Sequence, residues 1–192
     1  LARKWMLEDK FVIGYVGTHG MAHGLKNVLD VAERLKADKR IRFLLAGAGA
    51  ERDNLLKHAK KRSLSNIVFI PMQPKEEMPA VWSLCNVALV HLKNDPAFSE
   101  VIPSKIFEAM AMGLPILIAI PDGEARRVVE DNAAGIWVPP ENPQAFVDAV
   151  QKLSNNDQLC KKLSINSLAA APNYSRSIQA DKMIAVFKKA LL

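Results

Sequence analysis

Short apolar segments alternate along the chain with longer segments that repeat apolar residues every three or four positions. The shorter kind, such as Phe11–Val16, predicts buried strands, and the longer kind predicts amphipathic helices. Strands that are apolar throughout are typical of a parallel sheet covered by helices on both faces, so we expect an α/β/α domain with a mainly parallel six-stranded sheet. The expected strands are residues 11–16, 41–46, 67–70, 87–90, 114–120 and 135–138. The expected helices are about residues 25–36, 51–62, 76–84, 123–130, 143–153, 157–170 and 175–190, with one more beginning near Pro103.

Composition indicates one globular domain with an anionic partner. The 192 residues are 49% hydrophobic and 24% charged, which suffices for a single core, and the net charge is +6. No aromatic residues are interleaved with the basic clusters, which argues against nucleic acid. Cys85 and Cys160 match no metal or redox spacing, and no uncharged run is long enough to span a bilayer. We expect a cytoplasmic protein.

Three loops follow expected strands and should therefore meet at the carboxyl edge of the sheet, where folds of this class bind ligands. They are residues 17–24, called the first loop below, residues 71–74, and residues 91–103. The glycines of the first loop match neither the dinucleotide fingerprint nor the P-loop, but they let backbone amides approach an anion. His19 and His23 are candidate donors to phosphate. The sequence has no Asp-x-Asp and no zinc spacing, so we expect neither a metal nor a cofactor.

Two acids, Glu100 and Glu108, frame the stretch around which the chain is organised. Pro103 suits the first turn of a helix, which places Glu100 in the preceding loop and Glu108 on the second helical turn. Gly113 fits the end of that helix. A helix N-terminus with a cation nearby, here Lys105, can bind phosphate, and an acid on the same helix can hold a pair of sugar hydroxyls. This combination predicts a nucleotide-sugar site.

The same stretch carries a resemblance to a known family. The Glu100-x7-Glu108 unit, followed by Ala-Met-Ala-Met-Gly-Leu-Pro-Ile, resembles the C-terminal domain of the family 4 retaining glycosyltransferases, which have the two-domain GT-B fold with Rossmann-like halves. Weaker matches cover the chain from Phe11 onward. They are the first strand with its glycine loop, the Ala-Gly-Ala-Gly run from Ala46, Val68-Phe-Ile-Pro, Gly135-Ile-Trp-Val-Pro-Pro and Tyr174-Ser-Arg.

The resemblance implies a role for each acid. Glu108 is expected to hold the donor ribose, and Glu100, the catalytic candidate, to lie beside the donor sugar and its phosphates. The family has Arg and Lys in the first loop where this chain has Thr18 and His23, so we expect Lys105 to supply the missing charge. The usual Phe-Gly after the first acid is Ile102-Pro103, which removes one backbone donor. The expected donor-binding residues are Gly17, Thr18, His19, Gly20, His23, Met72, Gln73, Val101, Ile102, Ser104, Lys105 and Glu108.

The implied activity is metal-independent transfer of a hexose or N-acetylaminosugar from a nucleotide diphosphate-sugar, with a UDP-sugar favoured. The acceptor would be a glycan or a polyprenyl- or lipid-linked molecule bound by an N-terminal domain, in lipopolysaccharide, O-antigen or capsule biosynthesis, with peripheral association to the cytoplasmic face of the inner membrane. A UDP-sugar 2-epimerase of the same fold and a non-catalytic nucleotide-binding module are the alternatives.

These expectations divide the chain into three parts. Residues 1–10 would end an interdomain linker, residues 11–172 would form the nucleotide-sugar-binding domain, and residues 173–192 would pack back on the N-terminal domain. We expect this chain alone to be inactive.

Overall fold

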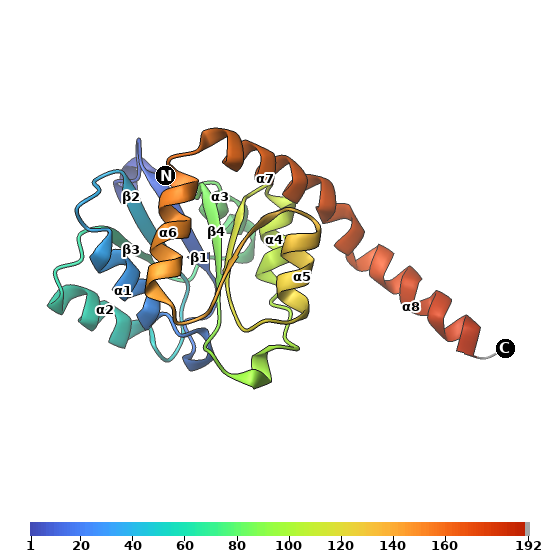
Figure 1. Ribbon diagram of the computed structural model, residues 1–192. Coiled ribbons are helices and arrows are strands. Elements are labelled where there is room, and N and C mark those ends of the chain that lie inside the picture. Colours follow the sequence, from blue (N-terminus) through green and yellow to red (C-terminus); the bar gives the residue numbers. More distant parts are fainter. Residues whose placement is uncertain (191–192) are drawn as a thin grey trace.

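The computed structural model describes residues 1–190 and shows a six-stranded, entirely parallel sheet with helices on both faces (Figure 1). The strand order is β3-β2-β1-β4-β5-β6. The predicted fold class is thereby confirmed, and four strands have the predicted bounds because their apolar runs end at glycine, proline or charged residues. The strands are β1 (Phe11–Val16), β2 (Ile41–Ala46), β3 (Ile67–Ile70), β4 (Val87–His91), β5 (Ile116–Ala119) and β6 (Gly135–Val138).

Two separate clusters of buried side chains hold the helices to the sheet. One cluster joins the sheet to α1 (Lys26–Arg34), α2 (Arg52–Lys61) and α6 (Pro143–Ser154). The other joins it to α3 (Met78–Trp82), α4 (Lys105–Ala111) and α5 (Glu124–Asp131). Helix α7 (Asp157–Ala170) contacts both α6 and α4, and it runs along the top of the domain in Figure 1. Short 3-10 turns complete the fold at Arg3–Trp5, Met21–His23, Lys75–Glu77, Pro96–Phe98 and Ala171–Tyr174.

Helix α4 begins two residues later than the sequence suggested. Ser104 precedes its first residue, Lys105, so Pro103 lies outside the helix and Glu108 lies in the first turn; the predicted positions of both were wrong. The predicted end was right, because Gly113 has a φ of 63° and its N–H donates to the Met110 carbonyl. The Leu114 N–H closes the same motif, and β5 therefore starts at Ile116 rather than at Leu114.

The expected helix at residues 76–84 is interrupted in the structure. It is a 3-10 turn followed by the short α3, whose second residue is Pro79. Proline lacks an N–H and suits the first turn of a helix, so the chain restarts its helix there.

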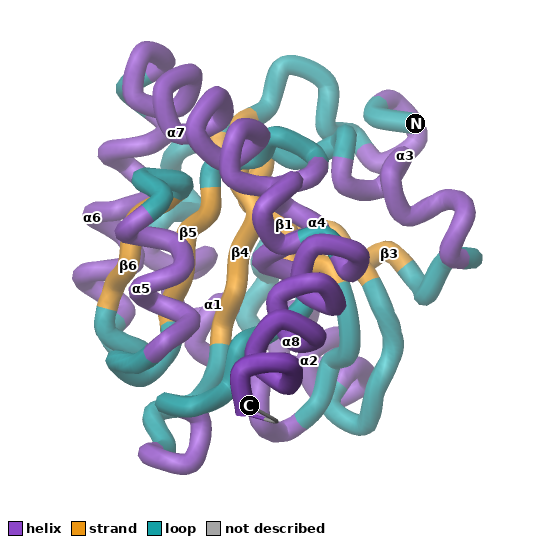
Figure 2. Tube along the Cα trace, turned by 90° about the vertical axis from the view of Figure 1, so that its right-hand side faces the viewer, coloured by secondary structure: helices purple, strands orange, loops and turns teal. Residues whose placement is uncertain are grey.

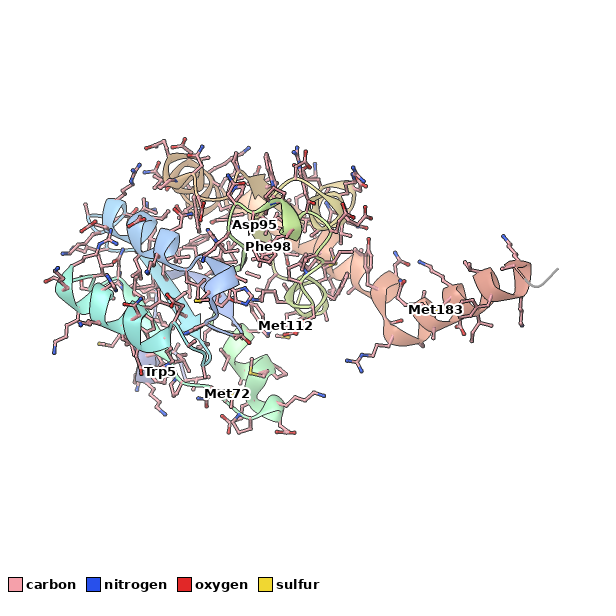
Figure 3. The ribbon with its side chains drawn as sticks, turned by 90° about the horizontal axis from the view of Figure 1, so that it is seen from below. Trp5, Met72, Asp95, Phe98, Met112 and Met183 are labelled. Carbon is pink, nitrogen blue, oxygen red and sulfur yellow. The ribbon has the colours of Figure 1, made fainter. Side chains whose placement is uncertain are left out.

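Helix α8 (Arg176–Ala190) extends away from the domain (Figure 1) and points toward the viewer in Figure 2. Its large apolar side chains are exposed, among them Ile178, Met183, Val186 and Phe187. Met183 stands clear of the domain in Figure 3. The assignment of this segment to another domain stays a prediction, and its last two residues lie outside the described part of the chain. Within residues 1–190, the helices are all too short or too polar to cross a membrane.

Candidate functional site

A cavity of about 870 Å³ opens at the carboxyl edge of the sheet, between the first loop, α3 and α4. Figure 3 shows this edge from below, with Met112, one of the lining residues, between α4 and the α3 segment. Eight of the predicted site residues line this cavity: Gly17, Thr18, His23, Gln73, Val101, Ser104, Lys105 and Glu108. The structure thus brings together residues from three of the expected loops and from the start of α4.

The other five predicted residues lie elsewhere. His19 is fully buried, Gly20 lines a second cavity of about 410 Å³, and Met72 lines a small one of about 150 Å³ next to Gln73. Glu100 and Ile102 are exposed and are not among the residues that line the large cavity. A catalytic role for Glu100 therefore stays a prediction.

The first loop is fixed by the loop that follows β2. The N–H groups of Gly17 and His19 donate to the carbonyls of Ala46 and Ala48 at 2.9 and 2.8 Å. A Cβ at Gly47 would collide with the Gly17 carbonyl oxygen, and the φ of Gly47 is 143°, so glycine is required there. The Ala-Gly-Ala-Gly motif thus serves loop packing.

This packing occupies some of the amides that were expected to face an anion, and the anion site itself stays a prediction. The amides of Gly17 and His19 are already occupied by carbonyls. At the start of α4, the N–H groups of Ile106 and Phe107 donate to the carbonyls of Pro103 and Ser104. These four amides are therefore satisfied within the chain. The Lys105 ammonium is one of the positive groups of the cavity wall, together with Lys75 and Arg176.

Lys105 is 8% exposed, and its ammonium is held by one tyrosine of β1. Its Nζ donates to the Tyr15 hydroxyl at 2.8 Å and lies 3.9 Å from the centre of the Tyr15 ring. The Tyr15 hydroxyl in turn donates to the Thr18 carbonyl at 2.7 Å. These contacts place the ammonium directly beside Gly17, at the floor of the first loop.

The charge of Lys105 has no close counter-ion in the part of the chain that the structure describes. Among residues 1–190, no carboxylate lies within 4 Å of its Nζ. Burial lowers the pKa of Lys105 to about 8, although the more distant Glu108 carboxylate acts in the opposite direction. A buried ammonium with only neutral partners in contact is unfavourable by itself, and an anion in the adjoining cavity would compensate it.

Glu108 lies on the same wall as Lys105, on the exposed side of α4. Its Oε2 accepts a long hydrogen bond of 3.4 Å from Nε1 of Trp82, which is 2% exposed. The indole fixes one carboxylate oxygen and leaves the other able to accept hydrogen bonds from a ligand. This arrangement suits a pair of hydroxyl groups.

His91 connects the cavity wall to the sheet. Its Nδ1 bonds the His23 carbonyl at 2.7 Å, and its Nε2 bonds the Asn27 side-chain nitrogen at 2.9 Å. Nδ1 must donate to the carbonyl, so Nε2 accepts from the amide and the ring is neutral. Burial lowers the pKa values of His91 and His19 to about 4, and it also lowers the pKa of His23. The three imidazoles are therefore neutral at pH 7.

Sequence reasoning missed several residues of this site. Lys75 and Arg176 line the cavity, and Arg176 opens α8. Tyr15 was treated only as part of a strand. Its position in a buried strand directly before the first loop could have identified it, because a buried hydroxyl needs a hydrogen-bond partner.

Metal ligands are not grouped in the described part of the chain. Among residues 1–190, no three or more His, Cys, Asp or Glu side chains are clustered so as to hold a metal ion.

Comparisons with known proteins identify the family. The glycosyl transferases group 1 model matches residues 2–169. The Pseudomonas aeruginosa protein named "Probable glycosyltransferase WbjE" is 29% identical in an alignment 191 residues long, which covers 96% of this chain and 46% of that protein. O-antigen chain mannosyltransferase C of Escherichia coli is 27% identical, over 92% of this chain and 44% of its own length. This chain thus spans about half the length of the curated relatives it matches.

The fold of this chain is also found among solved structures. The crystal structure of Anabaena Alr3699/HepE in complex with UDP superposes with a TM-score of 0.83 at 18% identity, over 98% of this chain and 51% of that one. The likeness that the Glu100-x7-Glu108 unit indicated is thereby confirmed: the chain belongs to the glycosyl transferases group 1 family.

Proposed function

We propose that this chain binds a nucleotide diphosphate-sugar, with a UDP-sugar as the favoured donor, for retaining transfer of the sugar to a glycan or lipid-linked acceptor. The observation that carries the proposal is the buried Lys105 ammonium, which has no carboxylate within 4 Å among the described residues and lines the same cavity as Glu108. The Lys105 ammonium calls for an anion, and the Glu108 carboxylate suits ribose hydroxyls. The UDP bound by Anabaena HepE, which shares the fold, supports this choice of ligand.

The chemistry assigned to the site is stabilisation of a leaving diphosphate. As the bond from the sugar to the diphosphate breaks, the electron pair goes to the phosphate oxygen, where negative charge grows. In the proposal, Lys105 meets that charge without a metal ion, and its placement before the reaction avoids reorganisation of the site. Glu100 is proposed to face the sugar, and a second domain is proposed to bind the acceptor.

Calorimetric titration of this chain with UDP, with and without EDTA, tests the proposal. We expect binding that EDTA leaves unchanged. Glu108→Ala should weaken UDP by about 10- to 150-fold, because hydrogen bonds to a charged acceptor contribute roughly 1.5–3 kcal/mol. Glu108→Gln, which keeps one acceptor oxygen, should lose less. Glu108→Ala with a lower melting temperature but unchanged UDP affinity would show that Glu108 is only structural.

Glu100 calls for a different readout. We expect Glu100→Ala to leave UDP affinity nearly unchanged and to abolish transfer by the full-length protein. Product analysis in the same assay separates transfer from epimerisation of the donor, and an epimerised UDP-sugar would overturn the assignment as a transferase.

A further inference from the structure

We propose that Tyr15 is a positioning residue that ties the Lys105 ammonium to the first loop, so that cation and loop meet the diphosphate as one rigid anion site. The inference rests on the proposed function of the cavity. It adds a residue from the centre of the sheet that does not line the cavity and would act only through Lys105.

The two bonds of the Tyr15 hydroxyl fix its role. The oxygen accepts from Lys105 Nζ at 2.8 Å and donates its own proton to the Thr18 carbonyl at 2.7 Å. The phenol thereby bridges a side chain of α4 and the backbone of the first loop, although Tyr15 and Lys105 are 90 residues apart in sequence. If the hydroxyl is removed, the ammonium keeps its position beside Gly17 only through packing.

Tyr15 suits a ligand site because it is an uncharged partner of the Lys105 ammonium. Tyr15 is fully buried, and burial raises its pKa well above its usual range, so the phenol stays protonated. A carboxylate in its place would hold the ammonium equally well but would cancel its charge. A phenol orients the ammonium and leaves the positive charge available to a bound anion.

The surroundings of the ring keep it in place without adding charge. The rings of His19 and His23 lie 5.9 and 5.7 Å from the Tyr15 ring, on the side of the first loop. Both imidazoles are neutral at pH 7, because burial lowers the pKa of each. A phenylalanine would satisfy this packing alone, so packing does not account for the hydroxyl.

The test compares the binding of UDP and uridine by this chain and by its Tyr15→Phe variant. We expect Tyr15→Phe to weaken UDP by about tenfold and uridine by less than about twofold, since only UDP carries the phosphates that Lys105 would meet. Tyr174→Phe is the matched control. It removes a hydroxyl that accepts from Asn132 at 2.8 Å, away from the cavity, and should leave both affinities unchanged.

Two further measurements separate positioning from general stability. In the Lys105→Ala background, Tyr15→Phe should cause no additional loss of UDP affinity. Between pH 7 and 9 the UDP affinity of the wild-type chain should fall as Lys105 loses its proton, and in Tyr15→Phe this fall should occur at lower pH, because the ammonium has lost its acceptor. Uridine titrated in parallel corrects for ionisation of the base.

The outcomes are distinct. A wild-type chain that binds no UDP would refute the proposed function itself. Wild-type binding together with an unchanged affinity and pH profile in Tyr15→Phe would refute only the role of Tyr15, as would an equal loss with and without Lys105. If Tyr15→Phe does not fold, a fluorotyrosine at position 15 in the Tyr174→Phe protein keeps ring and hydroxyl. Its fluorine resonance should move on UDP binding, and a resonance that stays in place would overturn the inference.

Discussion

Replacing Lys105 by methionine should make the protein more stable while weakening its binding of UDP. The pKa of Lys105 falls from an ordinary 10.5 to about 8 through burial. At about 1.36 kcal/mol for each pKa unit, the fold disfavours the charged ammonium by roughly 3 kcal/mol. Methionine has a similar volume and no charge, so the variant escapes this cost. It loses the hydrogen bond from the ammonium to Tyr15, which is worth about 1.5–3 kcal/mol because the donor is charged.

The net gain at pH 7 is at most about 1.5 kcal/mol, which corresponds to a rise of no more than roughly 6 °C in melting temperature for a chain of this size. The pH dependence gives a second signature. Because the folded pKa lies below the unfolded one, the unfolded chain binds the extra proton between pH 8 and 10.5, and the contribution of Lys105 to stability rises with pH in that window. The advantage of the variant should therefore be greatest at pH 7, disappear between pH 8 and 10.5, and turn into a disadvantage near pH 10.5, where only the loss of the hydrogen bond to Tyr15 remains.

Urea unfolding of both proteins from pH 7 to 10.5 measures this difference. The comparison between the two proteins is essential, because burial raises the pKa of Cys85 to about 12 and so lowers stability above pH 9 in both. Lys57→Met, on the exposed side of α2, is the control and should change neither stability nor UDP affinity. A Lys105→Met variant that is less stable than wild type at every pH would refute the reasoning.

Three further predictions concern the scaffold. Gly47→Ala should cost more than about 2 kcal/mol in urea unfolding, because both its φ and the Gly17 carbonyl exclude a Cβ. Gly113→Ala should cost only about 1 kcal/mol, because there a Cβ would make ordinary van der Waals contacts and only the positive φ opposes it. Stability should fall as the pH drops from 6.5 through 4, because His19 and His91 are buried neutral and the unfolded chain binds protons first; His91→Asn should flatten that slope in acid titrations followed by circular dichroism. Amides of α8 should exchange with deuterium far faster than those of β4, and equal protection in a dilute monomer would contradict the exposed position of that helix.

The sheet could be predicted from the sequence because most of its strands are continuous runs of apolar residues. The helix that carries Glu108 was also recognisable, since Gly113 and Pro115 mark its end. The predicted start of this helix was wrong, because the sequence does not distinguish a proline in the first turn of a helix from one that lies two residues before it, as Pro103 does. Lys105 and Glu108, the two charged side chains of α4 that line the cavity, are among the residues that the sequence predicts for the site.

The bonding partners of that site could not be predicted, because they depend on contacts between distant segments. No local pattern shows that the amide of His19 is taken by the carbonyl of Ala48, or that the His19 ring turns into the core. The same holds for Tyr15, whose partner lies 90 residues further along the chain. The position of a tyrosine in an apolar strand predicts that the residue is buried, but it does not predict which group will hydrogen-bond with its hydroxyl.

The choice of lysine at position 105 runs against local preference in two respects, and this argues for a ligand. A cation at the first position of a helix opposes the helix dipole, and a buried ammonium without a carboxylate partner is costly. Leucine or methionine would satisfy both the helix and the core. The phenol of Tyr15 reduces neither cost by neutralisation; it only fixes where the charge lies. A stable fold has no need of this pair, and the negative charge of the proposed diphosphate ligand would account for its cost.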